Sequence, residues 1–171
     1  AASDVYKRQI ISCSVGKLNK TKKGSVNMIE SDAIKLLREC DAGVKMGVSS
    51  ITEVVDHVKN EDFRQYLTKC KAEHDKLSDE IQSLLDDYHD DGKSPNPIAK
   101  GMSWMKTNMT LIADDSDSSI ADIMTDGCNM GVKSLARYLN QYEAANEFSK
   151  DIAKRLISLE EQLGADIRRY L

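Results

Sequence analysis

The chain has 171 residues, 24 Lys or Arg and 28 Asp or Glu, which give a formal net charge of −4. From residue 28 onward it holds no basic cluster that could release counterions from phosphates, so nucleic acid is excluded as an expected partner. The mean hydropathy is −0.48, and no run approaches the ~20 apolar residues of a spanning helix, so no membrane association is expected.

The first 27 residues differ in composition from the rest of the chain. Residues 1–27 hold six Lys or Arg and one Asp, show no helical periodicity, and precede Met28 and an expected helix start at Ser31 and Asp32. We interpret them as a non-native or disordered leader and residues 28–171 as a single domain. The rival interpretation, a targeting peptide, fails because the apolar stretch Ile10–Gly16 is too short and too polar.

Two long amphipathic helices are predicted next, each with one inward stripe whose members alternate three and four residues apart. The first stripe contains a carboxylate and comprises Ile34, Leu37, Asp41, Val44, Val48, Ile51, Val55 and Val58. The second contains a histidine and comprises Phe63, Leu67, Cys70, His74, Leu77, Ile81, Leu84 and Tyr88. In an antiparallel pair that closes at Asn60, Val48 is expected opposite His74 and Asp41 opposite Ile81.

Two further helices are predicted in the second half of the chain. The third stripe comprises Ile120, Met124, Cys128, Val132, Leu135, Leu139 and Tyr142. The fourth comprises Ile152, Leu156, Leu159, Leu163, Ile167 and Tyr170. Asn60 and Asn146 stand between the paired helices, where asparagine can end one helix in the left-handed conformation and cap the next.

The two halves resemble each other in sequence. Lys45–Ile51 reads Lys-Met-Gly-Val-Ser-Ser-Ile, and Asn129–Leu135 reads Asn-Met-Gly-Val-Lys-Ser-Leu. Such an echo predicts two related helical hairpins that pack against each other. Gly47 and Gly131 fall inside helices, where glycine is unfavourable, which suggests close helix packing at both positions.

A long linker joins the two hairpins and is sized to cross the whole bundle. It runs from Asp90 to Asp117, far longer than the 2 to 8 residues that antiparallel neighbours need. Within it, Ile98, Met102, Met105, Met109 and Ile112 form a stripe that predicts a short helix lying over the bundle. The expected fold is therefore all-α: a four-helix bundle of two repeated hairpins joined by a long crossover that contains a short helix.

With its paired Met-Gly-Val segments and this crossover, the chain resembles the ferritin-like domain families of small bacterial proteins. The resemblance implies a di-iron site with inward-facing Glu residues and Glu-x-x-His motifs. The sequence contains no Glu-x-x-His, and Glu160 and Glu161 flank the fourth stripe instead of belonging to it. In the repeat, His74 aligns with Leu159 and Asp41 with Thr125. A symmetric iron site is therefore not expected.

The polar members of the stripes have two interpretations. In the first, His74 and Asp41 are structural, His74 bonded inside the core and Asp41 reached by Lys45 or a hydroxyl group, so that no cofactor is needed. In the second, Cys70 and His74 lie on one helix face and form half of a zinc site that Cys128 or Asp41 completes.

The expected function follows from these two interpretations. The first predicts a non-enzymatic structural or interaction protein, a homo-oligomer or a component of a larger assembly such as a spore layer. The alternative is a metal-binding or thiol-based stress protein with an asymmetric site at Cys70, His74, Cys128 and Asp41. Three cysteines after residue 28, without a Cys-x-x-Cys pair, indicate a reducing compartment, so cytoplasmic localisation is expected.

Overall fold

The computed structural model describes residues 20–92 and 116–171, with side chains described from residue 31 onward. Every regular element within these ranges is helical, so the predicted all-α class is confirmed. The elements are α2 (Lys20–Val54), η1 (Val55–His57), α3 (Glu61–Asp87), α5 (Asp117–Gln141), α6 (Glu147–Ile167) and η2 (Arg168–Tyr170).

The first long helix begins earlier than the sequence predicted. α2 starts at Lys20 and runs through Met28 without a break, whereas a start at Ser31 was expected. Extending an existing helix requires no new nucleus, and Lys is a good helix former, so residues 20–27 continue the helix despite their lack of an apolar stripe. Residues 1–19 lie outside the described ranges.

The predicted capping role of the two asparagines is confirmed. The side chain of Asn60 accepts a hydrogen bond from the backbone N–H of Phe63 at 3.0 Å, and Asn146 accepts one from Ser149 at 2.8 Å. Each bond satisfies a donor at the start of a helix. The predicted left-handed conformation is wrong, because φ is −75° at Asn60 and −67° at Asn146.

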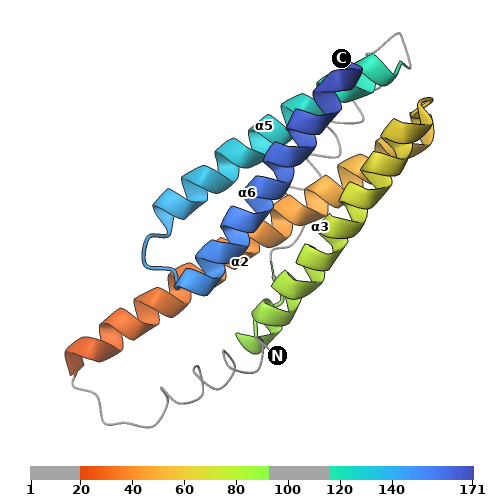
Figure 1. The fold of residues 1–171 in the computed structure, drawn as a ribbon. Coiled ribbons are helices and arrows are strands. Elements are labelled where there is room, and N and C mark those ends of the chain that lie inside the picture. Colours follow the sequence, from red (N-terminus) through yellow and green to blue (C-terminus); the bar gives the residue numbers. More distant parts are fainter. Residues whose placement is uncertain (1–19, 93–115) are drawn as a thin grey trace.

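The four long helices form two antiparallel hairpins, α2 with α3 and α5 with α6. Figure 1 shows α2 and α6 running in one direction and α3 and α5 in the other. The end of α3 and the start of α5 lie at opposite ends of the bundle (Figure 1). The short helix predicted for residues 98–112 lies outside the described ranges.

Side chains at the helix ends hold the two hairpins together. At one end, the Asp117 carboxylate accepts hydrogen bonds from the backbone N–H groups of Lys59 at 2.7 Å and Asn60 at 2.8 Å. At the other end, the Asn146 amide donates to the Tyr88 hydroxyl at 3.0 Å. The turn of each hairpin is thereby bonded to a helix of the other hairpin.

The buried apolar side chains form two clusters stacked along the bundle. On α3, Phe63 and Leu67 belong to one cluster, and Leu77 and Ile81 belong to the other. His74 lies between these two pairs and is fully buried. The buried apolar residues of α2, α5 and α6 also fall into these two clusters, so a short polar layer separates two apolar cores.

Most members of the predicted stripes are buried, but on three helices one stripe position is displaced by one residue. Val48, Leu84 and Leu159 were expected in the core, but each is only half-buried. Their neighbours Gly47, Leu85 and Glu160 face inward instead. One residue turns a helix by about 100°, and a stripe with mixed three and four spacing does not fix the phase of the inward face more closely than that.

Candidate functional site

Each long helix contributes one residue to the layer between the two apolar cores. We call Gly47 of α2, His74 of α3, Gly131 of α5 and Glu160 of α6 the polar layer. An added Cβ atom on Gly47 would lie 3.2 Å from Glu160 Oε1, and one on Gly131 would lie 3.6 Å from Glu160 Cδ. The two glycines therefore leave the space that the buried carboxylate occupies.

His74 and Glu160 meet in the middle of this layer. The Nδ1 atom of His74 donates to the backbone carbonyl of Cys70 at 2.8 Å, and Nε2 lies 3.4 Å from Glu160 Oε1. Because Nδ1 already carries a proton, the contact at Nε2 requires one further proton, held either by the imidazolium or by the carboxyl group. The pair therefore shares one titratable proton.

The environment favours that proton on His74. Burial alone would lower the pKa of the imidazole, but the hydrogen bond and charge of Glu160 outweigh it, and the pKa of His74 is raised above its ordinary value of 6.5. Glu73 and the Cys70 carbonyl act in the same direction. When His74 is protonated, the layer holds a buried ion pair whose two charges compensate each other.

The close approach of α2 to α3 depends on Gly47. A Cβ atom at this position would lie 2.8 Å from Cδ2 of His74, closer than side chains pack in folded proteins. The expectation that Val48 lies opposite His74 is therefore wrong by one residue. Val48 instead lines a shallow surface depression between α2 and α3 together with Asp75 and Ser78.

The two thiols near the polar layer are buried and protonated. Cys70 and Cys128 belong to the same apolar cluster and are 4% exposed. Burial, followed by the charge of Glu160, raises the pKa of the Cys128 thiol far above its ordinary value, and burial also raises the pKa of Cys70. Thiols of this kind behave as small apolar groups, because nucleophilic attack requires the thiolate.

Asp41, the fourth sequence candidate, lies away from the polar layer. Its side chain is fully buried and accepts a hydrogen bond from Lys45 Nζ at 2.8 Å, as the structural interpretation predicted. It lies where α3 ends, because an added Cβ on Gly92 would be 2.8 Å from Asp41 Oδ2. Among the described residues, no group of three or more His, Cys, Asp or Glu side chains is arranged to hold a metal ion.

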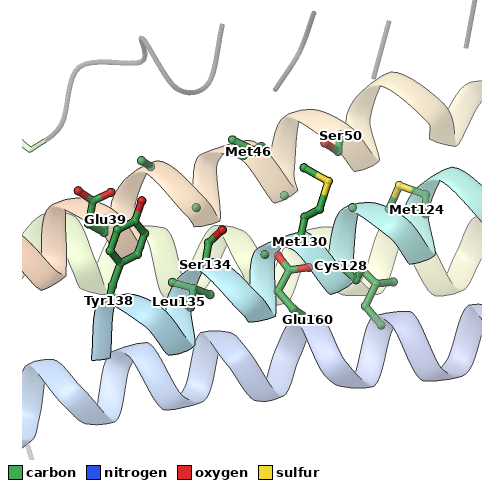
Figure 2. Close-up of a pocket in the computed structure, with 16 residues that line it drawn as sticks. Glu39, Met46, Ser50, Met124, Cys128, Met130, Ser134, Leu135, Tyr138 and Glu160 are labelled. Atoms are coloured by element: carbon green, nitrogen blue, oxygen red, sulfur yellow. The ribbon is translucent and has the colours of Figure 1, made fainter. Parts of the chain in front are cut away.

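A groove between α2 and α5 opens onto the polar layer. Its volume is about 440 Å³, within the range of small-molecule and side-chain binding pockets. Small residues of α2 and α5 line its walls, and Glu160 and Leu163 of α6 line its inner side. Figure 2 shows the Glu160 carboxylate directed into the space between α2 and α5, where Met130 and Ser134 also point.

The groove combines apolar walls with acidic groups. Its described lining includes two carboxylates, Glu39 and Glu160, and contains no Lys, Arg or His. Met130, which also lines the groove, is 53% exposed. Such a groove can bind a ligand whose apolar stem packs against the walls and whose polar or cationic end contacts a carboxylate.

The sequence analysis missed Glu160, although a signal for it was present. His74 and Glu160 are each 14 residues beyond the asparagine that caps their helix. Counted from these caps, the histidine aligns with Glu160 and not with Leu159. The buried pairs Leu77 with Leu163 and Ile81 with Ile167 follow the same register.

Comparison with known proteins does not assign this site. No protein-family model, no curated protein and no solved structure matches the chain. None of the helices in residues 20–92 and 116–171 is both long and apolar enough to span a membrane.

Proposed function

We propose that this chain is a ferritin-like bundle that acts by association with a second copy of itself and not by catalysis. The helix directions, and the positions of the end of α3 and the start of α5 at opposite ends of the bundle, support two hairpins joined by a crossover that spans the bundle. The buried groups of the polar layer contact one another, which supports a structural role for them. In this proposal, the role of the fold is to hold a surface that binds the second copy.

The α2–α5 groove with Met130 beside it is the observation that carries this proposal. A two-fold interface requires a patch that fits itself, with a projection and a recess on the same face. Met130 supplies an exposed apolar side chain, and the groove supplies the recess. Lys133 and Arg137 are exposed on the same helix as Met130, and the groove is lined by Glu39 and Glu160, so bases and acids are both available for contacts between two copies.

Sedimentation of the purified chain over a wide concentration range tests the proposal. We expect a reversible dimer, and we expect Met130→Glu to weaken it at least about tenfold, because a carboxylate would enter an apolar contact. Leu171→Glu is the matched control, since Leu171 is 57% exposed and does not line the groove. A monomer at every concentration, or equal effects of both substitutions, would overturn the proposal.

The alternative function, a metal-binding or thiol-based stress protein, receives weaker support. The structure brings Cys70, His74 and Cys128 to one region but leaves Asp41 near the end of α3. Metal analysis of protein purified without chelator separates the two functions. Close to one equivalent of zinc in the unaltered chain, lost in His74→Leu, would favour the alternative. Metal binding would then also contribute to folding stability.

A further inference from the structure

The Glu160 carboxylate is only partly satisfied within the bundle. It is 8% exposed, and a buried carboxylate ordinarily takes short hydrogen bonds of about 2.7 to 2.9 Å from a cationic partner. Its contact with His74 Nε2 is longer, at 3.4 Å. The thiol of Cys128, from α5, is a weak donor that adds little. The carboxylate therefore keeps acceptor capacity on the side that faces the groove.

The rest of the groove suits an unbranched apolar stem. Met46, Met124 and Met130 line it with flexible thioether side chains that adapt to the shape of an occupant. Gly43 and Gly127 keep the walls of α2 and α5 free of bulk. The methylene groups of such an occupant would pack against the apolar walls, and a hydrogen-bond donor at its end would bind Glu160.

We infer that the α2–α5 groove selects an ammonium group carried on an apolar stem and that Glu160 is the residue that anchors it. The inference rests on the proposed function, because it takes the groove to be the binding surface. In the proposed dimer, the ammonium belongs to Lys133 of the second copy. This lysine is exposed and follows Met130 by three residues on α5, so the two side chains are neighbours on the helix surface.

A proton on His74 competes with the ammonium for Glu160. The groups that face the pair are the Cys70 carbonyl and Glu73 on α3 and the protonated thiol of Cys128 on α5, while α2 contributes Gly47 and no charge at this level. When His74 is protonated, Glu160 is already neutralised and an incoming cation is repelled. When His74 loses its proton, the carboxylate is left without a cation, so affinity for an ammonium rises with pH.

The test uses three probes with the same six-carbon chain: n-hexylammonium, n-hexanol and hexanoate. Binding to the full chain is measured by titration calorimetry from about pH 6 to about pH 8. We expect n-hexylammonium to bind at least about tenfold more tightly than n-hexanol, more tightly as pH rises, and to dissociate the dimer. Hexanoate should bind most weakly, because its charge has the same sign as Glu160.

Glu160→Gln should remove both the preference for the ammonium and the pH dependence, while the exposed neighbour Glu161→Gln should change neither. The probe series on the unaltered chain decides the question even if Glu160→Gln does not fold. Equal binding of n-hexylammonium and n-hexanol would overturn the ammonium site, and so would binding that survives in Glu160→Gln. If the chain still dimerises in either of these cases, the proposed self-association stands without the ammonium site. If the chain is monomeric but binds n-hexylammonium selectively, self-association alone is overturned.

Discussion

His74 and Glu160 occupy the same position in the two hairpins, and their side chains meet at the centre of the bundle. Each lies 14 residues after its capping asparagine, and Nε2 of one is 3.4 Å from Oε1 of the other. A base and an acid at this equal distance from the two caps therefore lie face to face, so each supplies the partner that the other needs. Burying either one alone would leave a polar group without compensation.

Removing the histidine alone should destabilise the protein. Although His74 aligns with Leu159 in the sequence echo, replacing it by Leu leaves Glu160 buried without its partner. We expect a loss of about 1 to 3 kcal/mol in the free energy of unfolding, measured by urea titration. Replacing both residues, His74→Leu with Glu160→Met, should recover most of this loss. An unchanged free energy of unfolding in His74→Leu alone would contradict the pairing of His74 with Glu160.

The same pair should make stability depend on pH. The pKa of His74 is raised in the folded chain, so the folded state binds the proton more tightly than the unfolded state does. This contribution is fully present below the unfolded pKa of about 6.5 and is lost as pH rises through the folded pKa. The melting temperature should therefore fall from about pH 6 to about pH 8, before unfolded thiols ionise. Glu160→Gln should flatten the profile.

Two mid-helix glycines should respond in opposite directions to the same substitution. Gly47→Ala should destabilise the bundle, because its Cβ would lie 2.8 Å from the His74 ring. Gly127→Ala should stabilise it by about 0.5 to 1 kcal/mol, because nothing lies within 4 Å of the added atom and alanine favours the helix. Thermal melts of both variants against the unaltered chain check this. Changes of the same sign would show that α2 does not approach α3 as described.

Sequence reasoning predicts the local features of this fold well. Four long helices, the caps at Asn60 and Asn146, and the burial of Asp41 beside Lys45 all depend on residues close together in the chain. Helix periodicity and capping chemistry are local properties, so they can be read without knowing the packing.

The candidate site could not be predicted in the same way, because it depends on how helices face one another. The stripe spacing placed Glu160 beside the inward face, and charged side chains are rarely buried without a partner. Its burial makes sense only once His74 is known to lie opposite it and Gly47 and Gly131 are known to leave room. The α2–α5 groove likewise arises between elements that the sequence does not place side by side.

The bond between the hairpins at Asp117 offers a final test of the arrangement. Its carboxylate accepts from two backbone N–H groups, those of Lys59 and Asn60, which belong to the turn of the other hairpin. Asp117→Ala leaves both donors without this partner and should lower the free energy of unfolding by about 1 to 3 kcal/mol. Asp122→Ala, an exposed aspartate on the same helix, should have a much smaller effect in the same urea titration. If both variants have the same free energy of unfolding, the hydrogen bonds between Asp117 and the α2–α3 turn do not stabilise the bundle.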